Sequence, residues 1–275
     1  MIRPINFGFN DETSKDNHYQ KKINKKNIAQ LAVEEFENMV LHLKNSDVDV
    51  HVYNDDDMYK TPDSVFPNNW ISTHQNGDVV LFPMLAKSRR MERRPEILDF
   101  LKNQGFMINN VIDYSFAEKD SQFLEGTGSM ILDRKNKIAY CSISERSTKE
   151  LFIKFCKDFK YIPVSFHSFQ DVEKKRLPIY HTNVMMCLAE SYCIICLDCI
   201  DDSEERINVI NYLENSGKEL IEISENQVEN FAGNMLELLN DKGESLLVMS
   251  KSAENSLNRS EEHTSELQSP MYLVC

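Results

Sequence analysis

An amphipathic helix followed by a short strand recurs along this chain, and that repeat constrains the fold more than any other feature. Apolar residues at helical spacing predict four helices, over residues 28–45, 92–104, 147–159 and 204–216. Strands are predicted directly after them, over residues 48–53, 106–114, 161–166 and 218–223. Gly105 and Gly217 fit helix C-terminal caps. The helix centres recur roughly every 55–62 residues, a period typical of repeated supersecondary units.

A fifth helix is predicted to begin near Ser250, an N-cap residue, and to continue past residue 260. A polar segment with a different character, residues 259–275, interrupts it. The stretch Arg259–Ser269 resembles the in-frame translation of a sequencing-library adapter. The sequence therefore predicts one domain over residues 1–258, with four complete units and a truncated fifth, followed by a non-native tail over 259–275.

Charge and hydropathy exclude two classes of partner. The chain carries 31 Lys and Arg against 44 Asp and Glu, a net charge of −13, which repels nucleic acid. No apolar run reaches the ~18 residues of a membrane span, and the N-terminus lacks the apolar run of a signal peptide. We therefore expect a cytoplasmic protein with reduced cysteines. The sequence gives no oligomeric state and leaves a homodimer open.

The spacing Cys193-x-x-Cys196-x-x-Cys199 would suit a metal site. These cysteines nevertheless lie in a mainly apolar run that reads as a buried strand. Residues three apart on a strand face opposite sides, so Cys196 would point away from the other two. The sequence therefore favours a core role and predicts no metal or cofactor.

Polar residues interrupt apolar or turn-rich stretches at three places, Thr61–Trp70, Phe123–Ser129 and Tyr180–Leu188. Asp63 lies in the first, Glu125 precedes a Gly-x-Gly turn in the second, and His181 and Asn183 fall on one face of an extended third. A structural role explains each of them singly: a turn, a cap or a buried histidine. The glycine pair is too short for a dinucleotide loop.

Taken together, the three segments resemble the guanidine-modifying (pentein) superfamily of arginine deiminases, dimethylargininases, agmatine deiminases and amidinotransferases. Within that superfamily, the three segments most resemble those of the citrulline-utilization hydrolases, which are often labelled amidinotransferases. The resemblance covers residues 1–258 and implies an α/β fold, a propeller of five pseudosymmetric ββαβ-type units around a central active site. That expectation agrees with the repeat in the sequence.

The resemblance also assigns roles to residues that bind the substrate. Asp63 matches the substrate-binding Asp that follows a Pro, and Asn69 matches a second position that is usually Asp. Arg89 matches an Arg that grips the substrate carboxylate, and Arg90 is the less favoured choice.

The catalytic positions are matched only in part. Glu125 matches the acid of a Glu-Gly-Gly turn, here Glu-Gly-Thr-Gly, and His181 matches the catalytic histidine. Asn183 matches a position that is Asp in the deiminases. The Gly-rich stretch that carries the nucleophilic Cys is absent, and neither Cys275 nor Cys187 has a matching context, so this polypeptide is expected to be inactive.

The implied activity is hydrolysis of a C–N bond in a ureido or guanidino amino acid through a Cys-linked covalent intermediate. Asn69 and Asn183 replace carboxylates that would balance a guanidinium, which favours citrulline over arginine as the small-molecule substrate. Two alternatives stay open, an amidinotransferase and a non-catalytic binding protein with the same fold. A generic doubly wound α/β protein is the alternative fold.

Overall fold

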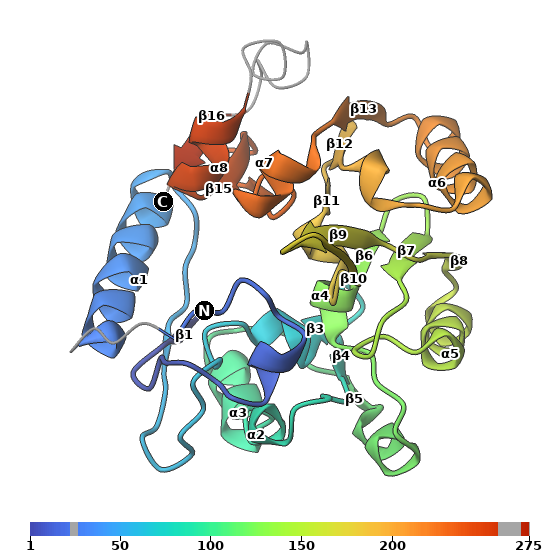
Figure 1. Ribbon diagram of the computed structural model, residues 1–275. Helices are drawn as coiled ribbons and strands as arrows, with labels where there is room; N and C mark the ends of the chain where they lie inside the picture. Colours follow the sequence, from blue (N-terminus) through green and yellow to red (C-terminus); the bar gives the residue numbers. More distant parts are fainter. Residues whose placement is uncertain (23–26, 258–270, 275) are drawn as a thin grey trace. The chain divides into compact units, whose positions relative to one another are not determined.

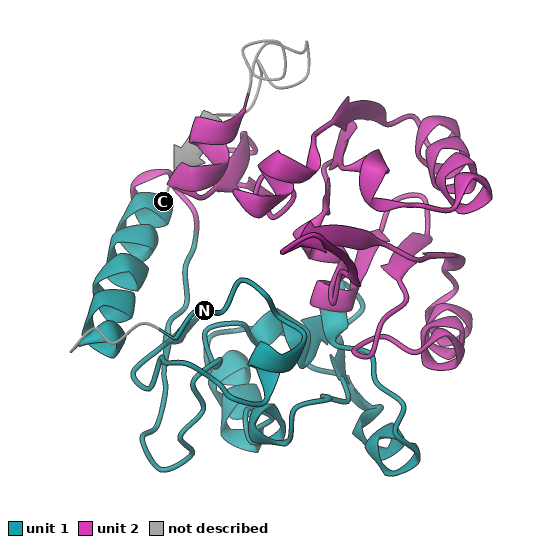
Figure 2. Cartoon of the chain, in the orientation of Figure 1, with its two compact units in different colours: residues 1–44, 49–126 teal, residues 45–48, 127–275 magenta. Residues whose placement is uncertain are grey.

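The computed structural model describes residues 1–22, 27–257 and 271–274. They form two compact units (Figure 2). Unit 1 comprises Met1–Lys44 and Asp49–Gly126, and unit 2 comprises Asn45–Val48 and Thr127–Cys275. The prediction of one domain over residues 1–258 is not tested by this division. None of the described helices is long and apolar enough to cross a membrane.

Unit 1 contains short strands joined by helices and irregular segments (Figure 1). Its elements are β1 (Ile2–Arg3), η1 (Thr13–Lys15), α1 (Ile28–Asn45), β2 (Tyr53–Asn54), η2 (Pro67–Asn69), β3 (Ile71–Thr73), β4 (Asp78–Leu81), α2 (Lys87–Arg90), α3 (Pro95–Asn103), β5 (Asn110–Asp113) and η3 (Ser115–Asp120).

Unit 2 continues the same alternation. Its elements are α4 (Gly126–Ser129), β6 (Met130–Asp133), β7 (Ile138–Ser142), α5 (Lys149–Phe159), β8 (Ile162–Phe166), β9 (Phe169–Val172), β10 (Lys175–Pro178), η4 (Thr182–Val184), β11 (Met186–Leu188), β12 (Tyr192–Ile195), η5 (Leu197–Cys199), α6 (Ser203–Asn215), β13 (Glu219–Glu222), α7 (Glu225–Glu229), β14 (Leu236–Leu239), β15 (Ser245–Met249), α8 (Lys251–Ser256) and β16 (Met271–Val274).

Among the described residues, four three-stranded sheets repeat one ββαβ connection. In each, the first strand pairs antiparallel with the second, and the second pairs in parallel with the third. The parallel pairing requires a crossover, which the helix between the second and third strands supplies. The sheets and helices are β3-β4-β5 with α3, β6-β7-β8 with α5, β11-β12-β13 with α6, and β14-β15-β16 with α8. The parallel pair β1-β2, joined by α1, is a shorter version of the same repeat, without the first strand.

The predicted helices and this predicted repeat are therefore present, and the closure of the units into a propeller stays a prediction. Each of the four predicted helices lies within three residues of its expected bounds, as α1, α3, α5 and α6. The fifth begins at Lys251, where the Ser250 side chain accepts from the Ala253 N–H, and it ends at Ser256. Its predicted continuation lies outside the described residues.

The strand predicted over residues 48–53 is wrong except at its end, because only Tyr53 and Asn54 pair. Their partner β1 is only Ile2–Arg3. Residues 48–52 alternate in the sequence but form no strand, because a segment without a paired neighbour makes no ladder.

The segment over residues 259–275 was assigned no place in the fold, and the fifth unit was expected to be truncated. Both expectations need correction at Met271–Val274, which forms β16 and pairs in parallel with Leu246–Met249 of β15. The last ββαβ repeat therefore has three strands, β14, β15 and β16, like the other three-stranded sheets. The adapter-like stretch Arg259–Ser269 itself lies outside the described residues.

Each unit has its own apolar core. In unit 1, Trp70 is fully buried and packs with Ile2, Met84 and Ile97. In unit 2, all five residues of the central strand β7 are buried, since β6 and β8 flank it and α5 packs beside β8 (Figure 1).

Deleting residues 271–275 should lower stability, because β15 loses the backbone partner of four residues. At about 0.5–1 kcal/mol per net hydrogen bond, a loss of roughly 2–4 kcal/mol in the free energy of unfolding is expected in a urea titration. An unchanged titration curve would show instead that the segment lies outside the fold.

Candidate active site

Arg89 lies at the centre of a buried polar cluster in unit 1. It sits on the short helix α2 and is 3% exposed. Its Nε and Nη2 donate to the two carboxylate oxygens of Glu92, each at 3.0 Å, and its Nη1 donates to Asn69 Oδ1 at 2.7 Å. Glu92 follows three residues later in the chain, so one turn brings the two side chains together. The pair is a bidentate, fully buried ion pair.

Asp63 lies beside this pair. Its Oδ2 accepts from Asn10 Nδ2 at 2.7 Å and from Thr13 Oγ1 at 3.3 Å, and lies 4.0 Å from Arg89 Nε. The Asp63 carbonyl accepts from Arg89 Nη2 at 3.5 Å and from the Phe66 N–H at 3.0 Å. Both the side chain and the backbone of Asp63 are therefore fixed.

Glu125 reaches the cluster from the other end of the unit 1 sequence. It is fully buried, its Oε1 accepts from the Leu85 N–H at 3.0 Å, and its Oε2 lies 4.0 Å from Arg89 Nη1. The next residue, Gly126, has a φ of +48°, and a Cβ there would lie 2.2 Å from the Asn68 carbonyl oxygen. Only glycine allows this close approach. It brings Glu125 next to the segment that carries Asn69.

The cluster holds more negative than positive charge. Asp63, Glu92 and Glu125 surround a single arginine. Burial raises the pKa of Glu92 to about 7, although Arg89 opposes the shift. For Arg89, burial lowers the pKa, but Glu92, Glu125 and Asp63 together raise it above its ordinary value. The cluster thus groups three buried carboxylates with one guanidinium, an excess of acidic over basic groups.

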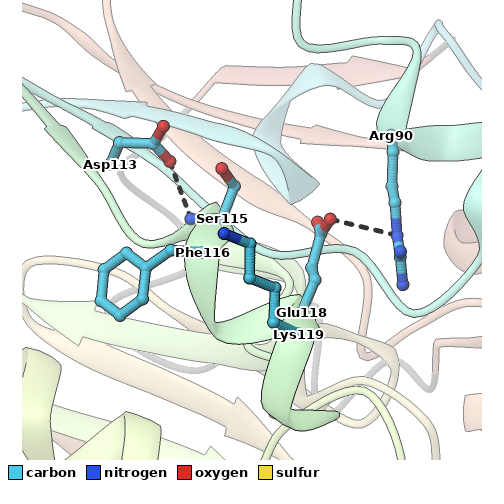
Figure 3. Close-up of a pocket in the computed structure, with 6 residues that line it drawn as sticks. All are labelled: Arg90, Asp113, Ser115, Phe116, Glu118 and Lys119. Carbon is cyan, nitrogen blue, oxygen red and sulfur yellow. Dashed lines mark hydrogen bonds and ion pairs between the residues drawn. The ribbon is translucent and has the colours of Figure 1, made fainter.

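Arg89 was expected to grip a substrate carboxylate, but the structure gives its donors to groups of the protein itself. Arg90, its neighbour, points elsewhere: its Nε donates to the Met84 carbonyl at 2.9 Å and lies 3.2 Å from Glu118 Oε2. Arg90 and Glu118 line an open surface pocket of about 470 Å³ (Figure 3), together with Asp113, Ser115, Phe116 and Lys119. Arg89 therefore belongs to the buried cluster, and Arg90 belongs to the surface pocket.

His181 belongs to unit 2. It is 4% exposed, has an extended backbone and forms the N-cap residue of η4, where its carbonyl accepts from the Val184 N–H. Its ring packs against Tyr180 with 4.8 Å between ring centroids. A Cβ on Gly233 would lie 2.4 Å from the Val184 carbonyl oxygen, so a glycine is needed where the two segments meet.

Asn183 does not share a strand face with His181, as the sequence analysis expected. Residues Thr182–Val184 form a 3₁₀ turn, so the two-residue alternation of a strand does not apply. Asn183 is half-buried, and its carbonyl accepts from Asn234 Nδ2 at 2.8 Å. The Thr182 hydroxyl accepts from the Ser142 N–H at 2.8 Å, which ties this turn to β7.

The six described cysteines are all buried free thiols, Cys141, Cys156, Cys187, Cys193, Cys196 and Cys199. Burial raises the pKa of Cys156 and of Cys187 to about 12. A hydrogen bond from the Cys199 side chain lowers the pKa of Cys196, but Cys196 is 0% exposed. None of these thiols is both ionised and accessible, as a nucleophile must be. Cys275 lies outside the described residues.

The cysteine-rich run departs from the predicted strand. The strand β12 ends at Ile195, and Leu197–Cys199 form the turn η5, which brings Cys196 and Cys199 into contact. Cys196 therefore does not point away from Cys199, and the orientation predicted for a strand is wrong at this pair. Within the part of the chain that the structure describes, no group of three His, Cys, Asp or Glu side chains could hold a metal ion.

Sequence reasoning missed Asn10, Glu92 and Arg146. Glu92 had a readable signal, its position three residues after Arg89. Asn10 had none, because it reaches Asp63 from an irregular segment 53 residues away in sequence. Arg146 of unit 2 is 3% exposed and stacks on Tyr180 at 4.6 Å, next to His181.

Comparisons with known proteins identify the family and the fold of the chain. The family described as "N,N dimethylarginine dimethylhydrolase, eukaryotic" matches residues 3–271. Among solved structures, apo ArgZ, an arginine dihydrolase from the ornithine–ammonia cycle in cyanobacteria, has a TM-score of 0.74 at 19% identity over 100% of this chain and 37% of that chain. The chain thus spans little more than a third of full-length ArgZ. Among curated proteins, no match is significant.

Two further structures are similar. The substrate-bound N-terminal domain of ArgZ has a TM-score of 0.67 at 18% identity, covering 99% of this chain and 88% of that chain. Dimethylarginine dimethylaminohydrolase, as an adduct with S-methyl-L-thiocitrulline, has a TM-score of 0.59 at 14% identity, covering 99% and 89%. At these identities the likeness shows the fold alone.

The family match over residues 3–271 shows the class: the chain is a member of the guanidine-modifying (pentein) superfamily, as its motifs indicated, and the fold of the solved neighbours agrees with it. Within that class, it belongs to the family N,N dimethylarginine dimethylhydrolase, eukaryotic, whose match covers nearly its whole length.

Replacing Gly126 with alanine should destabilise unit 1 strongly, because the new Cβ meets two carbonyl oxygens, those of Asn68 and Asn69. A loss of roughly 3 kcal/mol or more in the free energy of unfolding is expected from a urea titration. Gly105→Ala is the matched control, since Gly105 also has a positive φ but nothing lies within 4 Å of its Cβ position, and it should cost about 1 kcal/mol. Equal losses would refute the close-approach argument.

The raised pKa of Glu92 makes stability depend on pH. The folded protein keeps a proton on Glu92 that the unfolded chain releases between its ordinary pKa of 4.5 and about 7, so stability falls as pH rises through that window. Glu92→Gln should lose this fall, of up to about 3 kcal/mol, when unfolding free energies at pH 5 and pH 8 are compared. Parallel pH profiles for wild type and variant would contradict it.

Proposed function

We propose that this chain carries the substrate site of a hydrolase that cleaves a C–N bond in a guanidino or ureido amino acid, and that a nucleophile must be supplied for turnover. The observation that carries the proposal is the buried cluster of Asp63, Glu92 and Glu125 around one arginine. The family match and the titles of the neighbours, which name an arginine dihydrolase and a dimethylarginine dimethylaminohydrolase, point to the same chemistry.

A guanidinium fits this charge balance better than a ureido group. Above about pH 7, where Glu92 is ionised, the Arg89–Glu92 pair neutralises itself, and the carboxylates of Asp63 and Glu125 give the cluster a net negative charge. A planar cation with several N–H donors would balance that charge and could donate to both carboxylates. Asn69, whose amide favoured citrulline in the sequence, already accepts from Arg89 through Oδ1. We therefore place an arginine-type substrate ahead of citrulline and keep citrulline as the alternative.

In the proposed reaction, a cysteine thiolate attacks the central guanidino carbon, and Asp63 and Glu125 hold the substrate N–H groups. His181 donates a proton to the leaving amine as its C–N bond breaks. Water, deprotonated by the same histidine, then attacks the covalent intermediate, and the thiolate leaves as the ureido product forms. This scheme requires His181 beside the substrate carbon.

The nucleophile is the missing part of the proposal. The described cysteines are buried, and most have a raised pKa, so we expect the isolated polypeptide to bind substrate without turning it over. The same observation favours a second candidate, a binding protein for guanidino amino acids that has no catalytic step. The substrate is a small molecule under both readings, and we propose no cofactor.

Titration calorimetry with L-arginine and L-citrulline tests the proposal without needing turnover. Wild type should bind L-arginine more tightly, and Asp63→Asn should weaken that binding about 10- to 100-fold through loss of a charged hydrogen bond. Asp99→Asn is the control, since its carboxylate is 71% exposed and pairs only loosely with Lys102 at 3.6 Å. It should leave the binding unchanged.

Several outcomes would decide between the candidates. Binding of neither amino acid would overturn the proposed function. Tighter binding of L-citrulline would restore the substrate preference drawn from Asn69. Release of ammonia or of an amine from bound substrate would establish hydrolysis and remove the binding-protein alternative.

A further inference from the structure

The segment that carries Asp63 has little regular structure of its own. Residues 55–66 run between β2 and η2 as turns and irregular backbone. Such a segment keeps a fixed shape only when side chains satisfy and tie its backbone. What anchors it therefore decides where Asp63 points.

One buried carboxylate, Asp55, anchors both ends of the turn. Its Oδ2 accepts from Ser64 Oγ at 2.6 Å and from Thr61 Oγ1 at 3.3 Å, the hydroxyls on either side of Asp63. Its Oδ1 accepts from Arg94 Nη2, also at 2.6 Å. The carboxylate thus joins the Asp63 turn to Arg94, the N-cap residue of α3.

Arg94 is buried at this contact and pairs with Asp55. It is 3% exposed, is followed by Pro95 at the first turn of α3, and lies near the rings of Tyr59 at 4.7 Å and Tyr53 at 5.7 Å. Its Nε and Nη1 have no hydrogen-bond partner within the described chain. Asp55 is therefore its anionic partner, and removing Asp55 would leave a buried cation unpaired.

We propose that Asp55 and Arg94 act as positioning residues for Asp63, and that the Ser64 hydroxyl transmits their hold. The inference rests on the proposed function, because it assumes that Asp63 binds the substrate. Asp63 lies between two fixed points, the Asp55–Ser64 contact on one side and the Arg89 contact to its own carbonyl on the other. A small displacement of a binding carboxylate is costly, since directed hydrogen bonds tolerate little misplacement.

A double-mutant cycle tests the proposal with a small substitution. Ser64→Ala removes one hydrogen bond and keeps the Asp55–Arg94 pair, so the protein should stay folded. It should weaken L-arginine binding about three- to tenfold, as for one buried hydrogen bond. In an Asp63→Asn background the same change should have no further effect on binding, because the hydroxyl acts through Asp63. Additive losses would overturn the proposal.

A purely structural role is separated by a control and a second measurement. Ser72→Ala loses a comparable part-buried hydrogen bond to His74 in the same unit and should leave binding unchanged. Backbone amide exchange over residues 61–66 should become faster in Ser64→Ala and in Asp55→Asn, while exchange in β4 stays as in wild type. Unchanged exchange over 61–66, or equal losses of binding in both serine variants, would overturn the proposal.

The exchange measurement also separates this inference from the proposed function. If wild type binds neither L-arginine nor L-citrulline, the proposed function fails. Faster exchange over residues 61–66 in the two variants would then still support the anchoring of the turn, and unchanged exchange would refute it.

Discussion

The bidentate pair between Arg89 and Glu92 is the interaction on which the rest of the candidate site depends. A buried arginine must be paired, and a buried carboxylate close to it gains from the pairing. The third guanidinium nitrogen, Nη1, donates to Asn69 Oδ1. One carboxylate oxygen of Asp63 and one of Glu125 each lie 4.0 Å from a guanidinium nitrogen of Arg89. Removing Arg89 would leave three carboxylates close together without a counter-charge. The Arg89 charge is therefore needed for the fold of this cluster, whatever its part in binding.

The chain reaches this arrangement by bringing distant segments into close backbone contact. Gly126 lets Glu125 approach Asn68 and Asn69, and Asn10 reaches Asp63 across 53 residues. The Asp55–Arg94 pair adds a second buried ion pair behind the Asp63 turn. Two buried ion pairs, Arg89–Glu92 and Arg94–Asp55, therefore lie next to the side chains of unit 1 that we propose contact the substrate.

Periodicity in the sequence was enough to predict the helices, most of the strands and the repeat, because apolar spacing reports which face of each element is buried. The strand over residues 48–53 failed because a ladder needs a partner, and Ile2–Arg3 offers only two residues. The third strand of the fifth unit was missed since its residues were set aside with the tail. The motifs located Asp63, Asn69, Arg89 and Glu125, but the contacts that turn Arg89 inward depend on Glu92 and on long-range packing that no local pattern contains.

A crystal structure of the protein with bound L-arginine would test the central claim most directly. The account predicts the guanidinium within hydrogen-bond distance of both Asp63 and Glu125, with Arg89 still paired to Glu92. Density that places the substrate carboxylate on Arg89, with Glu92 displaced, would contradict it, and so would a guanidinium bound away from these two carboxylates.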